Sequence, residues 1–310
     1  MTTTLTLRSP EDLLAAAPVL LGFVPTESAV MFTFDAVNPF HARVDLPHDT
    51  DGVSEWIETL LAPCVVHGVG RVLFVLYSHH PLPAQRVCRR LVRSFRAAGI
   101  EVIDVLRADG HRWFPLLRSR RSLPATGVPY DVSTHRFAAE AVLRGRVTHA
   151  SRAALEATVA PDPAAMARVA QAVGDCGEVQ TAWLVATVAA QVAARSVPDD
   201  RDAARLLTGL QDEETRAAAM GLLSRDTAEA HADFWGGLVR RAPVDLVAPA
   251  AALLGIAAWL CGDGALAWCA VDRCLSTDPD HQPAHELARA LAEAVPPSTW
   301  EEVTALGDPA

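Results

Sequence analysis

The alternation of apolar and polar positions predicts an N-terminal half in which strands and helices alternate. Its clearest element is the continuous apolar run 71–78, which lies between Gly70 and the polar pair His79-His80. Such a short run of β-branched and aromatic residues is typical of a strand buried on both faces in an α/β sheet. We therefore expect the N-terminal half to be built around this strand.

Other segments of this half have the period of a strand or a helix. Strands are expected at 29–34, 40–46, 71–78, 101–107 and 111–117, and helices at 10–17, 52–66, 83–98 and 134–144. The first helix should follow the N-cap Ser9 and end at Pro18, and Ser133 or Thr134 should cap the last. Short links predict that the first two and the last two strands form antiparallel hairpins around a parallel pair.

From residue 151 onward the pattern is helical, so we place a domain boundary near 150. The predicted fold is a mixed, partly parallel α/β sheet of about five strands in 1–150, followed by an all-helical domain in 151–310. Leu254-Gly255, Ala267, Val271 and Pro279 have the spacing of a tetratricopeptide unit. A helical hairpin that packs on its neighbours and a peptide-binding repeat array both fit this spacing. The presence of one clear unit favours the hairpin.

Composition and charge narrow the function classes. The chain has a net charge of -10 and contains no Lys, so all 27 basic residues are Arg. An acidic chain disfavours a long nucleic-acid footprint. The apolar stretch 246–262 is shorter than the roughly 20 residues of a membrane span, and we expect a buried helix there. Six scattered Cys residues and an N-terminus without signal-peptide character predict a cytoplasmic protein.

Several motifs together resemble a known family. They are Leu7-Arg8-Ser9-Pro10, Leu20-Leu21-Gly22-Phe23, Arg43-Val44-Asp45-Leu46-Pro47, the run 104–110, Arg112-Trp113, Pro129-Tyr130-Asp131 and the segment from 251 through Asp278-Pro279. In these motifs the chain resembles the domain of unknown function 4192 family of actinobacteria. The resemblance implies a bacterial cytoplasmic protein without an established activity, and it assigns no catalytic residues.

Polar side chains follow the two strands that are expected to be parallel. In open α/β sheets, ligands bind beyond the carboxyl ends of such strands, and here those ends are Ser78-His79-His80 and Arg107-Ala108-Asp109. The ligand-binding candidates are Ser78, His79, Asp104, Arg107, Asp109, Arg112, Trp113, Tyr130 and Asp131. A His beside an Asp and an Arg could perform acid–base chemistry or bind an anion. An ordinary solvated loop is the alternative.

Two of these candidates have specific alternatives. Asp104 lies inside an apolar strand, so we expect its carboxylate to pair with an Arg such as Arg107 or Arg112. Arg112-Trp113 precedes Arg118, Arg120 and Arg121, a mixture of basic and aromatic residues that could contact phosphates or a single strand. A solvated hairpin edge protected by Arg is the competing interpretation.

No motif predicts a cofactor or a metal. A phosphate-binding loop with its Lys, a dinucleotide fingerprint and a nucleophile elbow are all missing from the sequence. His281 and His285 have the spacing of helical metal ligands, but Pro283 should begin the helix and leave His281 outside it. The leading hypothesis is a non-catalytic interaction or regulatory module with a possible protein partner at the helical domain. The alternative is an enzyme or small-ligand or anion-binding protein with its site at the strand ends, near a cleft between the domains.

Overall fold

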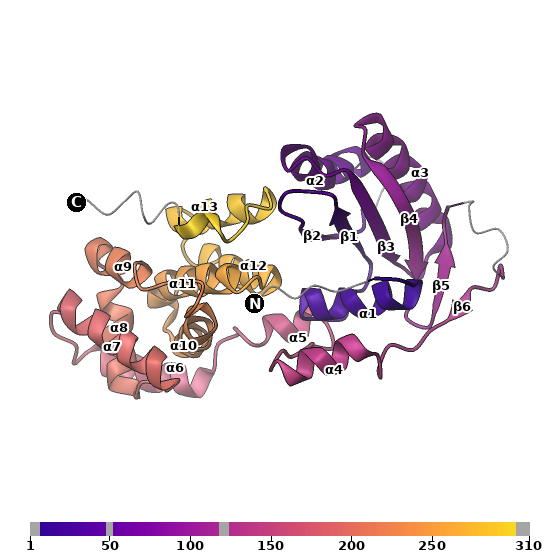
Figure 1. The fold of residues 1–310 in the computed structure, drawn as a ribbon. Helices are drawn as coiled ribbons and strands as arrows, with labels where there is room; N and C mark the ends of the chain where they lie inside the picture. The colour runs from indigo at the N-terminus through magenta and orange to yellow at the C-terminus, as the bar shows by residue number, and fades with distance from the viewer. Residues whose placement is uncertain (1–6, 48–51, 118–123, 302–310) are drawn as a thin grey trace. The chain divides into compact units, whose positions relative to one another are not determined.

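The computed structural model describes residues 7–47, 52–117 and 124–301, which divide into two units, Met1–Arg152 and Ala153–Ala310. In the first unit, six strands of the described chain form one sheet in the order β2-β1-β3-β4-β5-β6 (Figure 1). Their bounds are β1 Ser28–Phe34, β2 His41–Asp45, β3 Arg71–Tyr77, β4 Glu101–Ala108, β5 Arg112–Pro115 and β6 Val128–Pro129. The mixed α/β fold is confirmed, and the short strand β6 adds one strand to the expected sheet.

The pairing of β3 explains its continuous apolar sequence. It runs antiparallel to β1 and parallel to β4, so both of its edges are covered. The β3–β4 register shifts after Val72, which leaves Ile103 without an opposite residue and 40% exposed. All residues of β3 after Arg71 are buried. The predicted central strand and its parallel partner are therefore confirmed.

Helices cover both faces of the sheet. The helices α2 (Val53–Val66) and α3 (Pro81–Ala97) lie on one face, and α1 (Pro10–Leu21) and α4 (Arg136–Leu143) lie on the other (Figure 1). Alternate residues of β3 point into the two resulting cores, as the period of two requires. The sheet is the middle layer of a three-layer α/β/α unit.

The helix α1 is longer than predicted. The Ser9 hydroxyl accepts the Asp12 N–H at 3.1 Å, and the Asp12 carboxylate accepts the N–H groups of Ser9 and Arg8, which completes a capping box. The expected end at Pro18 is wrong, because the helix continues to Leu21 and stops at Gly22, whose φ is 73°. All residues from Leu13 to Ala17 are buried, and this packing stabilises the helix although Pro18 lies within it.

The start of α4 also differs from the prediction. His135, rather than Ser133 or Thr134, is the N-cap, and its Nδ1 accepts the Phe137 N–H at 3.3 Å. Its Nε2 lies 3.1 Å from the Asp12 carboxylate. Both the N–H and the side chain of Ser133 hydrogen-bond to Asp131, and the cap is supplied by His135, which also contacts Asp12 on α1.

The second unit is helical throughout its described residues. Its helices are α5 Arg152–Glu156 (which begins at the unit boundary), α6 Pro163–Val173, α7 Thr181–Ala194, α8 Asp200–Gly209, α9 Glu213–Met220, α10 Ala228–Arg241, η2 Val244–Leu246, α11 Val247–Leu260, α12 Gly264–Leu275 and α13 Gln282–Ala292. Every residue of α11 is buried, and α10, α12 and α13 pack around it. A helix that is apolar on all sides belongs in a core, as the sequence predicted.

The hairpin of α11 and α12 has the turn that the sequence indicated. Gly262 adopts a φ of 77°, and the Asp263 side chain caps α12 by accepting the Leu266 N–H at 2.9 Å. The two helices pack against each other. The likeness of the α11–α12 hairpin to a tetratricopeptide unit stays a prediction. Within the described chain, no helix is both long enough and apolar enough to cross a membrane.

Replacing Gly127 with Ala tests the close packing of the sheet edge. Gly127 has a φ of 76°, and a Cβ there would lie 2.5 Å from the Phe114 ring. We expect Gly127→Ala to lower the free energy of unfolding by about 2–4 kcal/mol, since backbone strain and overpacking add. Urea denaturation of the full chain measures this loss.

Gly110→Ala is the matched control, because Gly110 also has a positive φ, of 94°, but has open space around the added Cβ. It should lose only the strain component, roughly 1–2 kcal/mol. Equal losses for the two variants would contradict the role assigned to the Phe114 contact.

Candidate functional site

The parallel pair brings the ends of β3 and β4 together. Tyr77 lies opposite Ala108, and the Ser78 N–H donates to the Ala108 carbonyl at 2.9 Å. The structure therefore places Ser78 and His79 beside Arg107 and Asp109. Ser78 is buried, whereas the His79 side chain is exposed.

Arg107 is the interior cation of this site. It is 5% exposed, its Nη1 donates to the Ser78 carbonyl at 2.9 Å, and its guanidinium lies 3.8 Å from the centre of the Phe114 ring. The Asp109 carboxylate is 3.9 Å away. Burial lowers the pKa of Arg107 and the charge of Asp109 opposes that shift, but a guanidinium stays protonated in proteins. Arg107 therefore links the ends of two strands.

Glu27 completes the site, and the sequence did not predict it. Its carboxylate accepts the Ser78 hydroxyl at 3.1 Å and the His79 N–H at 3.0 Å. Glu27 has a φ of 38°, a conformation that non-glycine residues rarely adopt. Neither its position before β1 nor its residue type signals this role, because the contact depends on how β1 and β3 pair.

Asp109 holds the turn between β4 and β5. Its carboxylate accepts the N–H groups of His111 at 3.1 Å and of Arg112 at 2.8 Å. Burial raises the pKa of Asp109. These two N–H groups and the nearby charges of Arg107 and His79 lower the pKa, and together they outweigh burial, so the net shift is downward. Asp109 in turn contributes to a raised pKa of Tyr130, for which burial is the larger cause. The Tyr130 N–H donates to the His111 carbonyl at 3.1 Å, which places Tyr130 beside the same turn.

Three other candidates lie in separate contacts. The Arg112 Nη1 donates to the carbonyls of Thr126 at 3.2 Å and Gly127 at 3.0 Å. The Trp113 side chain is buried, and its Nε1 donates to Glu11 on α1 at 3.3 Å. Asp131 binds the Ser133 N–H. The hairpin residues Arg118, Arg120 and Arg121 lie outside the described residues.

The expected pairing of Asp104 with an Arg such as Arg107 or Arg112 stays a prediction. Within the described chain, the Arg107 guanidinium contacts the Ser78 carbonyl and the Phe114 ring, and the Arg112 guanidinium contacts the carbonyls of Thr126 and Gly127. Asp104 is 5% exposed, and its Oδ1 accepts the Val105 N–H at 2.9 Å, beside the register shift of β4. The bulge changes the direction of the Asp104 side chain, which strand periodicity alone does not predict.

His281 and His285 make separate contacts at the start of α13. His281 is the N-cap of α13, as predicted from Pro283, and its Nδ1 accepts the Ala284 N–H at 3.4 Å. The His285 Nε2 lies 2.7 Å from the Pro279 carbonyl. Among the residues that the structure describes, no cluster of three or more His, Cys, Asp or Glu side chains could hold a metal ion.

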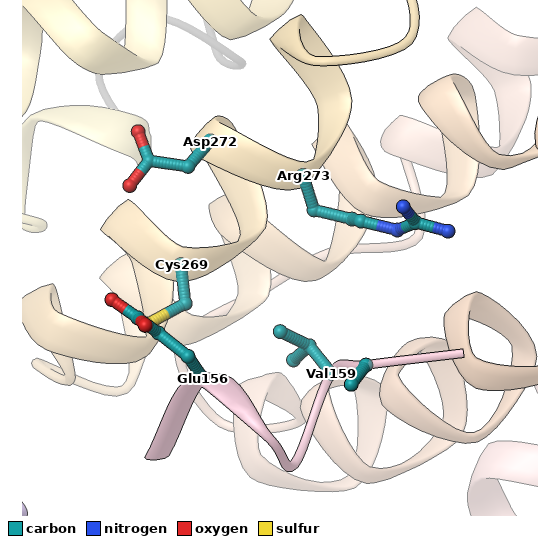
Figure 2. Close-up of a pocket in the computed structure, with 6 residues that line it drawn as sticks. Glu156, Val159, Cys269, Asp272 and Arg273 are labelled. Carbon is teal, nitrogen blue, oxygen red and sulfur yellow. The ribbon is translucent and has the colours of Figure 1, made fainter. Parts of the chain in front are cut away.

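Two pockets lie among the described residues of the helical unit. One, of about 350 Å³, lies between α12 and the segment after α5, and its lining is Glu156, Val159, Ala160, Cys269, Asp272 and Arg273 (Figure 2). The other, of about 490 Å³, is lined by polar and apolar residues that include Arg216, Asp245, Asp278 and His281. Sequence reasoning identified neither pocket, because each combines residues from helices far apart in the chain.

These features define a class of protein: an α/β unit with an internally bonded strand end, joined to a helical unit that contains pockets. A family model described as Domain of unknown function (DUF4192) matches residues 10–298, and the chain belongs to this family. No curated protein and no solved structure matches the chain.

Acid titration of an Asp109→Asn variant tests the electrostatics of the strand end. The pKa of Asp109 is lowered in the folded protein, so its charge stabilises the fold above the ordinary Asp pKa of about 3.9. That contribution disappears as the pH falls through the lowered folded pKa. We expect Asp109→Asn to cost about 1 kcal/mol at neutral pH and almost nothing near pH 2.

Urea denaturation at several pH values measures this difference. Glu58→Gln serves as the control, since Glu58 is an exposed carboxylate on α2 in the same unit. A difference between wild type and Asp109→Asn that stays constant with pH would show that the charge of Asp109 has no part in it.

Proposed function

We propose that the protein is a non-catalytic interaction module that binds an acidic segment of a protein partner. The observation that carries this proposal is a row of Arg side chains on α3. The exposed Arg residues of this helix are Arg86, Arg89, Arg90, Arg93 and Arg96. They recur at intervals of three or four residues, so they lie on one face of the helix. The helix contains no Asp or Glu.

The opposite face of α3 fixes the orientation of this row. Its buried residues are Ala84, Val87, Cys88, Leu91 and Phe95, which pack into the core between α2, α3 and the sheet. The helix is therefore held against the sheet, and its Arg face points to solvent. Such a fixed row of charges attracts an oppositely charged partner and speeds its association.

Charge is distributed unevenly along the chain, which supports the same proposal. The first unit contains 17 Arg and 14 Asp or Glu residues, and the second contains 10 Arg and 23 Asp or Glu residues. The basic row of α3 thus lies in the unit where Arg outnumbers Asp and Glu, whereas the second unit carries the excess of negative charge. Like charges three or four residues apart on a helix, such as Arg86, Arg89 and Arg93, repel one another, and an acidic partner would offset that repulsion.

An acidic protein segment fits this surface better than nucleic acid does. From Arg86 to Arg96 the row extends about 15 Å along the helix, which is short for a duplex footprint. The net charge of -10 of the whole chain also opposes a long polyanion. A short acidic segment can bind the row without bringing a large negative charge close to the rest of the protein.

The strand-end cluster supports a non-catalytic role. Glu27, Ser78, Arg107 and Asp109 use their hydrogen bonds on one another and on the backbone. A catalytic base or nucleophile needs a proton or lone pair directed at a substrate. The present bonds direct these groups toward closing the end of the sheet.

The helical unit is a second proposed surface for a protein partner. Its support is Trp268 on α12, which is 36% exposed, because aromatic side chains are enriched in protein interfaces.

A cytoplasmic, bacterial setting belongs to the same proposal. All six Cys residues are free, which fits a reducing compartment, and the absence of Lys fits a GC-rich genome.

Binding of labelled poly-glutamate to the full chain tests the Arg row. Poly-glutamate should bind at low salt, and Arg86→Gln with Arg93→Gln should weaken it by about tenfold, since each exposed charge contributes roughly 0.5–1 kcal/mol. Arg144→Gln with Arg146→Gln is the matched control, which removes two exposed charges from the same unit. Fluorescence anisotropy measures both.

Equal effects of the two double variants would contradict a specific role for α3. Tighter binding of duplex DNA than of poly-glutamate, with the same dependence on Arg86 and Arg93, would identify a nucleic-acid surface instead. A salt-independent interaction would exclude the charge-driven contact altogether.

A small anion at the strand end is the second candidate function. It is favoured by the exposed imidazole of His79, whose charge acts on Asp109 in the same cluster as Tyr130. Titration with inorganic phosphate, followed by NMR of the His side chains, would test it. Shifts confined to His79 that vanish in His79→Gln are the expected result, and uniform small shifts of exposed His residues would overturn it.

A further inference from the structure

An apolar patch is exposed at the end of α2, the helix that packs beside α3. Val65 and Val66, the last two residues of α2, are 60% and 76% exposed. Val37, in the loop between β1 and β2, is 92% exposed. The Phe40 ring at the end of that loop packs edge-on against the His67 ring, with 5.6 Å between their centres, so the loop lies beside the end of α2. We call Val37, Val65 and Val66 the valine patch.

The valine patch and the C-terminal end of the Arg row lie at the same end of the sheet. The strands β3 and β4 are parallel, and the Glu101 N–H at the start of β4 donates to the Gly70 carbonyl just before β3 at 2.9 Å. The helices α2 and α3 each end within four residues of the start of one of these strands, and they contact each other on one face of the sheet (Figure 1). Arg93 and Arg96, near the end of α3, therefore lie at the end of the unit that carries the patch.

The exposed face of α2 changes from acidic to apolar along the helix. Glu55 and Glu58 are exposed in its first half, and no charged residue of α2 follows Glu58. Because α2 and α3 run in the same direction, the acidic part of α2 lies toward the start of α3 and the valine patch lies toward its end. A segment bound along the Arg row thus meets negative charge near one of its ends and apolar surface near the other.

The acidic residues near the patch already have a cation beside them. Asp35 and Arg71 pair with each other, and the charge of Glu101 also acts on Arg71. Leu82, at the start of α3, is exposed as a single apolar residue, which is common on protein surfaces. Three exposed valines grouped next to a row of charges are a feature of protein interfaces, in which an apolar centre has a polar rim.

We propose that the acidic partner segment also carries a large apolar side chain near one end, which packs on the valine patch while the carboxylates lie along the Arg row. The proposal rests on the proposed function, because it describes the chemistry of the same partner more closely. Charge acts over roughly 10 Å, so charge alone allows many registers and both directions of the segment. Apolar contact is short in range, and an apolar anchor selects one register and one direction.

A lipid bilayer is a poorer fit to the same surface. Surfaces that insert into membranes typically present Trp, Phe or Leu, whereas the patch consists of three short valine side chains. The Arg row also extends along the side of α3 and not around the patch. An extended acidic segment can contact the row and the patch together.

Acidic peptides of equal length and equal charge test the anchor on the full chain at low salt. One has no apolar residue, and the others carry a pair of Leu residues at the amino end, at the carboxyl end or in the middle. We expect one of the two end-anchored peptides to bind about tenfold more tightly than the peptide without Leu, because its apolar pair is removed from water. The peptide with the central pair should gain less. Fluorescence anisotropy measures all four affinities.

Substitutions in the patch locate the gain. Val65→Ser with Val66→Ser should remove the tenfold difference and leave the affinity for the peptide without Leu unchanged. Val142→Ser with Leu143→Ser is the matched control, since these side chains are 72% and 86% exposed at the end of α4, on the other face of the sheet. The control variant should keep the full difference.

Equal affinities of all four peptides, or a gain that survives the patch variant, would overturn the apolar anchor and leave the charge-driven contact of α3 intact. If no acidic peptide binds, the proposed function fails first. Tighter binding to vesicles of phosphatidylglycerol than to any peptide, with the same dependence on Val65 and Val66, would identify a membrane surface instead. If the patch variant does not fold, the comparison of peptides on the wild-type chain decides.

Discussion

The structure of the first unit depends on the complete burial of β3. Val72, Phe74 and Leu76 point into the core under α2 and α3, whereas Leu73 and Val75 point into the core under α1. Because the two sets alternate on one strand, neither core can form without the other, and both helical layers are required. The edges of β3 are covered by β1 and β4. The backbone groups along β3 are therefore used within the sheet, and contacts to other parts of the unit are made at the two ends of the strand.

That constraint explains the composition of the strand end. Ser78 is buried immediately after β3, so its hydroxyl and carbonyl need partners from the protein. Glu27 accepts the hydroxyl and Arg107 donates to the carbonyl. The Arg107 guanidinium, itself 5% exposed, is stabilised by the Phe114 ring and the nearby Asp109. The same residues that suggest a ligand site in the sequence therefore close the end of the sheet.

Periodicity predicted the elements that carry most of the buried area. The helices α2 and α3 and the strands β1, β3 and β4 lie within a few residues of their expected positions, because each has a strong apolar period over its full length. The strand β6 was missed because two residues, Val128 and Pro129, carry no period. The end of α1 was misplaced because tertiary packing overrode the helix-breaking tendency of Pro18.

The candidate site was predictable in position but not in its bonds. Parallel pairing alone places Ser78 beside Asp109, so the sequence located the cluster. The contact from Glu27 depends on the pairing of β1 with β3, and the direction of Asp104 depends on a bulge. The His135 cap depends on the packing of α4 against α1. Such contacts between segments far apart in the chain leave no local pattern to recognise.

A chain without Lys uses guanidinium for every side-chain cation except His, and the surroundings of each Arg decide what it can do. The five donors of a guanidinium must be hydrated or bonded. On α3 the Arg side chains are exposed, so a partner can reach them. At Arg107 a carbonyl, a ring and a carboxylate surround the group, so it stabilises the fold. At Arg273 the Nε and Nη2 donors are buried and make no hydrogen bond within the described structure.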